Sequence, residues 1–267
     1  MQTAFDQIAL SYDEQFTNTV IGKKQREIVW NYLEGVLHSD VHLNILELNS
    51  GTGEDAIYFA QKGHNVTATD SSDEMINVTN KKINDYSLEE KISVRKLDIK
   101  ELGNAKFDPK YDLIFSNFGG INCVDKNVLE SLSKICKRIL NEGGRVMLVI
   151  MPKFCLWESI YFLLKFKLKS AFRRLSSKPI KAHLNNKEVY TYYYSPGMIR
   201  KYFEDEYVIR KITPVGFFIP PSYLNRFFSK KYQTFKLLCK LEAAVTNISF
   251  LAYASDHFLI DMDLFLN

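Results

Sequence analysis

Short apolar runs alternate with helical patterns along the first 150 residues of the chain. The apolar runs are typical of buried strands, and the segments between them space apolar residues as amphipathic helices do. The expected strands are 43–48, 65–70, 92–98, 111–117 and 145–151. The expected helices are 54–62, 73–85 with Asp73 as its N-cap, and 126–140, and residues 141–144 are expected to form a turn. Alternating strands and helices predict an α/β fold with a doubly wound, mainly parallel sheet and helices on both faces.

The alternation stops after Met151 and returns only in part. Ser195-Pro-Gly predicts a helix through Phe203, because proline suits the first helical position after a serine cap. Residues 207–213 and 257–264 alternate as strands and bring the expected sheet to seven. The expected organisation is a lid and ligand-binding core over 1–151, an inserted helical and aromatic cap over 152–194, a core helix and strand over 195–213, a second cap insertion over 214–255, and a final core strand over 256–267.

The stretch ILELNSGTGEDA (45–56) places two glycines between the first strand and the first helix. Such a turn brings backbone close to a ligand and points helix N–H groups at it. The pattern Gly51-x-Gly53-x-x-Ala56 also permits a dinucleotide. Asn49 stands where a further glycine is common, and asparagine tolerates the left-handed backbone better than most residues.

Three acidic residues near the ends of successive strands narrow the choice of ligand. Glu47 would repel a pyrophosphate but attract an ammonium group, Asp70 is placed to accept hydrogen bonds from ribose hydroxyls, and Asp98 can accept from an exocyclic amine. S-adenosylmethionine carries an ammonium group, a ribose and an adenine, and it has no phosphate. The acids therefore favour S-adenosylmethionine over a nicotinamide dinucleotide.

With these motifs the chain resembles the class I S-adenosylmethionine-dependent methyltransferases, which have a Rossmann-like fold. The matching segments are Glu47-x-Asn49-x-Gly51-x-Gly53, Asp70-Ser71-x-x-x-Met75, Asp98-Ile99, Asp112–Asn117 and LNEGGRVMLVI (140–150), preceded by the lid-like AFDQIALSYDEQF (4–16). The resemblance covers about residues 4–151, with weaker matches at 194–213 and 256–264.

The resemblance implies a role for each matching residue. The methionine end of the cofactor would lie against Tyr12, Glu47, Asn49, Gly51 and Gly53. The ribose would lie against Asp70, and the adenine against Ser71, Met75, Asp98 and Ile99. Asn117 and Phe118 would line the sulfonium side. The implied activity is methyl transfer to an O, N or C atom.

The acceptor is expected to be a small hydrophobic or aromatic molecule, a class that includes lipid-like compounds, because the segments after residue 151 are rich in aromatic side chains. A base is needed only if the acceptor atom carries a proton that must leave. Candidate bases are His183, Tyr193 and His257, and no metal-binding motif is present. Two alternatives stay open: an NAD(P)-dependent oxidoreductase, and a module that binds the cofactor without catalysing transfer.

The charge distribution suggests one further partner. The net charge is only +4, which does not favour nucleic acid, but residues 153–187 hold nine Lys and Arg and one acid, Glu158. This segment is expected either to cover the pocket with a solvated basic side, or to contact an anionic membrane or acceptor through Lys165, Lys167, Lys169, Arg173 and Arg174. Four scattered cysteines and an N-terminus unlike a signal peptide predict a cytoplasmic protein, with peripheral membrane contact as the alternative.

Overall fold

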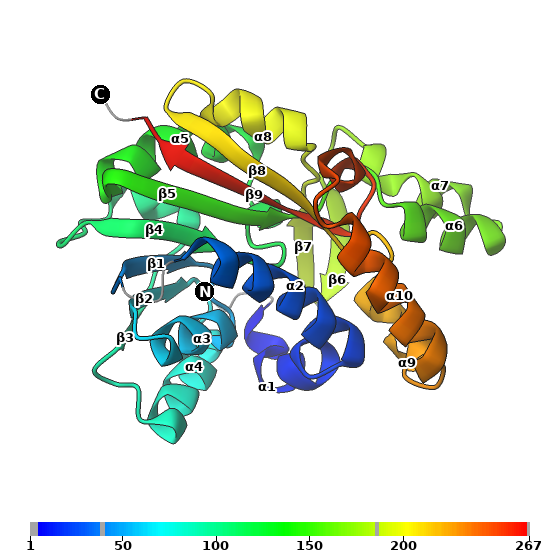
Figure 1. Ribbon diagram of the computed structural model, residues 1–267, viewed down its shortest axis with the longest axis horizontal. Coiled ribbons are helices and arrows are strands. Elements are labelled where there is room, and N and C mark those ends of the chain that lie inside the picture. Colours follow the sequence, from blue (N-terminus) through cyan, green and yellow to red (C-terminus); the bar gives the residue numbers. More distant parts are fainter. Residues whose placement is uncertain (1–4, 38–40, 185–186, 266–267) are drawn as a thin grey trace.

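The computed structural model describes residues 5–37, 41–184 and 187–265, without the side chains of residues 182–184 and 187. Seven strands form one mainly parallel sheet, as the sequence predicts, and their order is β3-β2-β1-β4-β5-β9-β8 (Figure 1). Their bounds are β1 Asn44–Leu48, β2 Asn65–Asp70, β3 Ile92–Lys96, β4 Tyr111–Ser116, β5 Leu140–Ile150, β8 Tyr207–Val215 and β9 His257–Leu264. Strand β9 is antiparallel to both β5 and β8, and the other pairings are parallel. The strand order reverses between β1 and β4, where open α/β sheets bind ligands.

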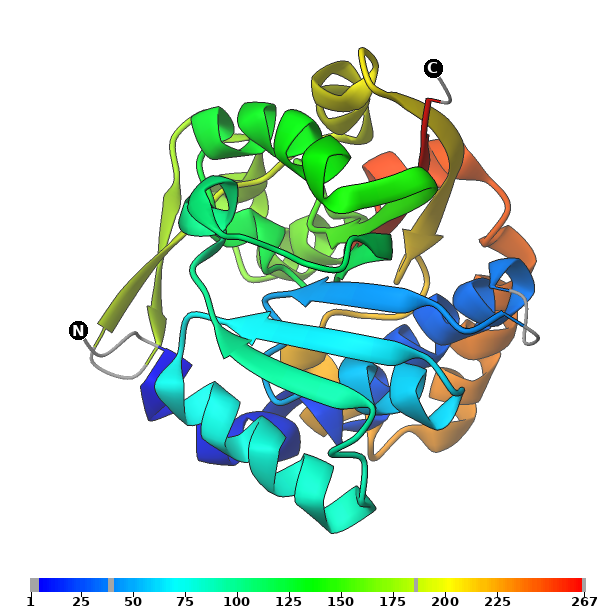
Figure 2. The ribbon, with the colours of Figure 1, turned by 90° about the vertical axis from the view of Figure 1, so that its left-hand side faces the viewer.

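Helices cover both faces of this sheet, and each face has its own apolar core (Figure 2). One face packs against α2 Val20–Val36, α3 Glu54–Gln61 and α4 Asp73–Tyr86, and the other against α5 Lys126–Ile139 and α8 Pro196–Phe203. Residues with no exposed surface, such as Phe115 and Phe258, lie between the layers. The predicted serine cap of α8 is confirmed, since the side chain of Ser195 accepts a hydrogen bond from the backbone N–H of Met198.

Two local predictions are wrong. Ser72, not Asp73, caps α4, because its hydroxyl accepts from the N–H of Met75 and so satisfies a donor in the first turn of the helix. Residues 141–144 belong to β5 instead of forming a separate turn. Leu140 already pairs with Tyr111, and the register shifts before Leu113 while Gly143 takes a positive φ of 70°. A glycine in this conformation lets pairing continue past an irregularity.

The N-terminal segment consists of the short turns η1 Phe5–Gln7, α1 Ala9–Tyr12 and η2 Asp13–Thr17. It packs on α4 through a small apolar cluster of Ile8, Ala9 and Met75. The remaining short turns are η3 Ile99–Asn104, η4 Ile121–Cys123, η5 Arg173–Leu175, η6 Ser222–Leu224 and η7 Ser249–Tyr253.

The two irregular segments form a cap beyond the carboxyl ends of the parallel strands (Figure 1). The first contains α6 Leu156–Leu164, α7 Leu168–Ala171 and the hairpin of β6 Ile180–Leu184 and β7 Lys187–Thr191; the second contains α9 Asn225–Phe228 and α10 Tyr232–Val245. They meet where the ring of Trp157 lies edge-on to Phe228, with centroids 5.8 Å apart, and its indole N–H donates to the carbonyl of Phe218. Among the described helices, none has the length and apolar content needed to cross a bilayer.

Candidate cofactor and acceptor site

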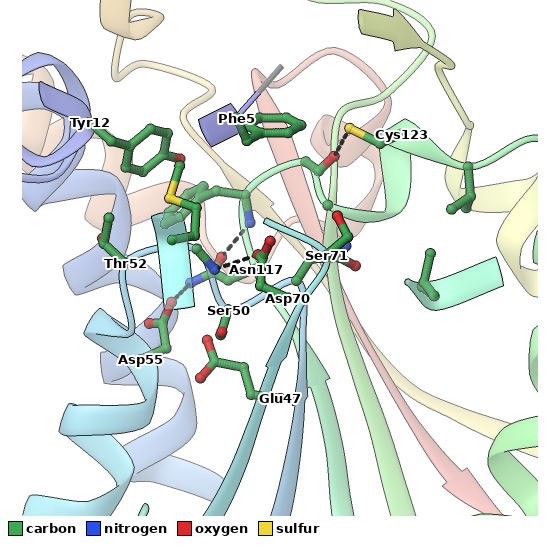
Figure 3. Close-up of a pocket in the computed structure, with 18 of the residues that line it drawn as sticks. Phe5, Tyr12, Glu47, Ser50, Thr52, Asp55, Asp70, Ser71, Asn117 and Cys123 are labelled. Carbon is green, nitrogen blue, oxygen red and sulfur yellow. Dashed lines mark hydrogen bonds between the residues drawn. The ribbon is translucent and has the colours of Figure 1, made fainter. Parts of the chain in front are cut away.

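A pocket opens at the carboxyl ends of β1, β2 and β4, at the reversal of strand order (Figure 3). Eleven of the twelve residues predicted to bind the cofactor line it. They are Tyr12, Glu47, Asn49, Gly51, Asp70, Ser71, Met75, Asp98, Ile99, Asn117 and Phe118. The twelfth, Gly53, lies at the start of α3 with its Cα hydrogen facing Thr79, so it shapes the loop without lining the pocket.

Three left-handed residues give the glycine loop its shape. Asn49, Gly51 and Gly53 have φ angles of 56°, 55° and 78°. A Cβ atom at Gly53 would lie 2.6 Å from Cγ2 of Thr79, so only glycine fits there without displacement. Asparagine is among the few residues that adopt this conformation readily, which explains how Asn49 is accommodated.

The Asp70 carboxylate ties this loop to the end of β2. Its two oxygens accept hydrogen bonds from the backbone N–H groups of Gly51 and Ser72, both at 2.9 Å. The side chain is 8% exposed, and burial raises its pKa despite these hydrogen bonds. A carboxylate has about four lone-pair sites, so acceptor capacity is left over for a ligand.

Beneath the loop, three polar atoms at the pocket are buried without a hydrogen-bond partner: Oε2 of Glu47, Oδ1 of Asn49 and Oγ of Ser50. Leaving buried polar atoms unpaired costs free energy, so a cluster of them at a pocket indicates a polar ligand. Glu47 is 1% exposed, and burial followed by the nearby Asp55 raises its pKa well above the usual range, while Arg26 opposes the shift. An ammonium group placed here would supply the missing donor and lower that pKa.

A buried ion pair beside Glu47 was not predicted. Arg26, from α2, donates to Asp55 at 2.6 Å, and this carboxylate also accepts from the indole of Trp30 and the amide of Asn117. The Arg26 guanidinium lies 5.3 Å from the centre of the Phe118 ring. The only sign of this ion pair in the sequence is Arg26, a charged residue among the mostly apolar buried residues of α2. The pair brings a buried cation to the pocket, where a ligand carboxylate can be recognised.

The N-terminal segment closes one side of the pocket. Asp13 accepts from the hydroxyl of Thr52 at 2.7 Å and forms an ion pair with Lys82 at 2.6 Å, so the segment is tied to the glycine loop and to α4. Tyr12 and Phe5 line the pocket from this side (Figure 3). Burial raises the pKa of Tyr12 to about 12, so its hydroxyl is a neutral donor at physiological pH.

On the side predicted for adenine, Met75 is buried and lines the pocket while also packing on the N-terminal segment. The carboxylate of Asp98 caps the following turn by accepting from the N–H of Lys100, and it lines the pocket as well. Glu188 and Val189 of β7 also line the pocket, which sequence patterns did not indicate because the hairpin is remote along the chain.

Of the candidate bases whose side chains the structure describes, Tyr193 and His257, neither lines the pocket. Tyr193 is buried with its ring 5.3 Å from the guanidinium carbon of Arg174. His257 lies behind Phe118, with ring centroids 5.3 Å apart and its Nδ1 3.3 Å from Asp256. The backbone of His183 lies in β6, and its side chain falls outside the described part of the chain.

These residues fit S-adenosylmethionine in both shape and chemistry. The unpaired oxygen of Glu47 suits its ammonium group, Arg26 suits its carboxylate, and Asp70 has room for ribose hydroxyls. A nicotinamide dinucleotide would place its pyrophosphate beside the glycine loop, where Glu47 would repel it.

Comparisons with known proteins agree with this assignment. Residues 45–144 match the methyltransferase domain family. A demethylmenaquinone methyltransferase of Bacteroides fragilis is 28% identical over 224 residues, covering 81% of this chain and 84% of the relative.

Solved structures share the fold. An S-adenosylmethionine-dependent methyltransferase of Clostridium acetobutylicum superposes with a TM-score of 0.59 at 15% identity, covering 98% of this chain and 99% of that one. A DhpI complex with SAH gives 0.60 at 15% identity, covering 97% and 92%. Residues 45–144 thus match a methyltransferase domain, and together with the geometry of the pocket the comparisons support an S-adenosylmethionine-dependent methyltransferase with the class I fold.

Proposed function

We propose that this methyltransferase acts on a small hydrophobic acceptor that contains an aromatic ring. The observation that carries the proposal is the division of the pocket into a polar floor and an apolar mouth. Glu47 and Asp70 lie on the floor, and Phe5, Tyr12 and Cys123 lie on the opposite side (Figure 3). Val124 and Val189 add to the apolar lining. Ligand pockets with such walls favour flat, apolar molecules oriented by few polar groups.

The Bacteroides fragilis relative supports a quinone-type acceptor as the first member of this class to test. Its name assigns it demethylmenaquinone, and it aligns over most of both chains. At 28% identity the acceptor itself can differ, so the proposal concerns the class of ring compound.

The ionisation of the lining residues constrains the acceptor further. Burial raises the pKa of Cys123 to about 11 and that of Tyr12 to about 12, so both stay protonated at neutral pH. Among the described lining residues there is no histidine. We therefore expect an acceptor that needs no base from a thiol, a tyrosine or a histidine, such as a readily ionised phenol or enol, or a neutral amine.

In this proposal the chain contributes position more than covalent chemistry. When bound, S-adenosylmethionine supplies an electrophilic methyl group. The Asp55–Arg26 pair and the Phe118 ring hold the floor rigid, the Tyr12 hydroxyl can donate to an acceptor oxygen, and the apolar wall excludes water from the reacting atoms. Fixing two reactants in line is a large part of the acceleration available to such a reaction.

The test is methyl transfer from labelled S-adenosylmethionine to a panel of acceptors, with products identified by mass spectrometry. The panel contains a reduced, short-tailed demethylmenaquinone, a simple naphthol, an apolar amine and a polar amino acid. We expect turnover with ring compounds and none with the polar acceptor, and Asp70→Ala serves as a variant unable to hold the cofactor. Transfer to polar acceptors alone, or equal rates across the panel, would overturn the proposal.

A further inference from the structure

The loop joining α6 and α7 forms a projecting tip, residues 164–169, in which apolar and basic residues alternate. Leu164, Phe166 and Leu168 are 77%, 95% and 65% exposed. Each of these residues is followed by an exposed lysine: Lys165, Lys167 and Lys169. Among the described residues, none of the three lysines forms an ion pair. Isolated exposed apolar residues are ordinary, but a contiguous group marks an interaction surface.

Phe166 is unusual in its backbone conformation as well as in its exposure. It has a φ of 55°, its N–H donates to the carbonyl of Leu163, and the N–H of Lys167 donates to that of Phe162. This pattern is a Schellman motif, in which the left-handed position is normally glycine. A bulky residue is strained there, and the Phe166 ring lies almost entirely in solvent. Folding therefore gains nothing from this phenylalanine, which points to a contact outside the chain.

Two helical segments of the cap, 152–175 and 217–255, carry exposed charges of one sign, whereas the hairpin carries Glu188 paired with Lys181. Segments 152–175 and 217–255 contain two acids, Glu158 and Glu242, and both are buried. Glu158 accepts from Arg173 and Arg174, and Glu242 accepts from the four backbone N–H groups of residues 216–219. The exposed charges of these segments are all basic: Lys165, Lys167, Lys169, Arg226, Lys230, Lys231, Lys236 and Lys240.

We propose that this face of the cap docks on an anionic phospholipid bilayer, with Phe166, Leu164 and Leu168 inserted among the lipids and the lysines against the headgroups. Apolar insertion combined with lysine attraction is the usual basis of peripheral binding to anionic membranes. The cap lies at the same end of the sheet as the pocket, so docking brings the pocket near the membrane (Figure 1). The inference stands apart from the proposed acceptor, because none of residues 164–169 lines the pocket.

The chemistry of the tip favours lipid over other partners. Nucleic acid would pair the lysines with phosphates but would leave Leu164 and Leu168 without a stacking surface. A second copy of the chain would bring two faces of like charge together. An anionic bilayer satisfies both the apolar and the basic side chains.

The experiment is co-sedimentation of the full chain with phosphatidylcholine vesicles, with and without phosphatidylglycerol. We expect binding only to the anionic vesicles. Phe166→Gly should preserve the fold, since glycine suits the left-handed position, and should weaken binding at least tenfold. Replacing the three tip lysines by glutamine should weaken it by about fivefold per lysine.

Matched controls separate docking from general effects. Ser87→Gly makes the same type of change at a left-handed residue ending α4, and glutamine at Lys106, Lys110 and Lys134 removes three exposed charges elsewhere. Both should bind vesicles as the parent chain does. In Phe166→Trp, we expect a blue shift of fluorescence on anionic vesicles and quenching by brominated lipid.

Several results would overturn the inference. One is equal vesicle binding by the parent chain, Phe166→Gly and the lysine variant, and another is a tryptophan at 166 that stays accessible to aqueous quencher. Absence of binding to anionic vesicles would also overturn it. So would RNA binding that Phe166→Gly abolishes, or self-association that Phe166→Gly abolishes. None of these readouts depends on methyl transfer, so they are independent of the proposed acceptor.

Discussion

Replacing Glu47 with glutamine should stabilise the empty protein while weakening its hold on the cofactor. The Glu47 side chain is 1% exposed, and its Oε2 atom has no hydrogen-bond partner among the described residues. Glutamine keeps the shape and removes the buried charge. If Glu47 is positioned for a ligand ammonium group, the protein without that ligand carries an uncompensated cost.

The expected sizes follow from this environment. Glutamine leaves a polar group in place but removes the cost of keeping a charge buried, so we expect Glu47→Gln to raise the free energy of unfolding by ~1–2 kcal/mol. For a chain of this size that is a rise in Tm of ~2–6 °C. Hydrogen bonds to charged groups contribute ~1.5–3 kcal/mol, so the Kd for S-adenosylmethionine should rise ~10- to 100-fold.

The pH dependence gives a second check. Burial raises the pKa of Glu47 above its usual 4.5, so the folded protein binds this proton more tightly than the unfolded chain does. The stability of the parent chain therefore falls as pH rises above 4.5, and this contribution is absent from Glu47→Gln. The Tm difference between the two should be small near pH ~4.5 and should grow toward pH ~8.

Differential scanning fluorimetry without ligand and calorimetric titration with cofactor measure the two effects. Glu54→Gln is the matched control, because Glu54 also lines the pocket but is paired with Lys82, so its replacement should not raise Tm. A lower Tm for Glu47→Gln together with unchanged cofactor affinity would refute the reasoning. Glu47 would then be an ordinary structural residue.

Four further changes test other parts of the structure. Asp70→Ala should abolish cofactor binding measured by calorimetry. If the variant bound S-adenosylmethionine with the affinity of the parent chain, the assignment of the site would be wrong. Asn49→Gly keeps the left-handed turn but removes an unpartnered amide oxygen at the pocket, so the cofactor Kd should rise ~3- to 10-fold with Tm unchanged. Asp13→Asn should loosen the N-terminal segment. Burial raises the pKa of Asp13, but hydrogen bonds from a lysine and from Thr52 outweigh it and leave the pKa lowered, so the parent segment should become protease-sensitive only as pH falls below about 4. Glu242→Gln leaves two of the four N–H groups facing an amide NH₂, so it should lower the free energy of unfolding measured in urea by ~2–4 kcal/mol. An unchanged free energy of unfolding would contradict a stabilising role for this carboxylate.

The sheet and the cofactor pocket could be predicted because their signals are local. Short apolar runs and two alternating segments locate the seven strands, and helical spacing locates the helices between them. The acids at strand ends fall together because parallel strands end at one edge. The serine cap of α4 was missed because Ser72 and Asp73 are both good caps, and only geometry shows which one accepts from the N–H of Met75.

Long-range pairings could not be predicted from such signals. Arg26 and Asp55 are 29 positions apart along the chain. Strand β7 reaches the pocket from a hairpin more than 60 residues after Phe118, the last residue predicted to bind the cofactor. Nothing in residues 187–191 distinguishes a pocket wall from any other edge strand. Contacts of this kind depend on how the segments pack, which composition and periodicity do not specify.

The cap shows why the structure is needed to choose which basic residues to replace in a test of membrane binding. Lys165, Lys167, Lys169, Arg173 and Arg174 form one basic group along the chain, but among the described residues only the three lysines are exposed and without an ion pair. Arg174 is buried between Glu158 and Asp256, at 3.0 and 2.8 Å. Neutralising it would leave two buried carboxylates short of a partner, at a cost of about 3–5 kcal/mol. A variant lacking all five charges could therefore lose membrane binding by unfolding, so only the lysine set, compared with Phe166→Gly, can test the docking surface.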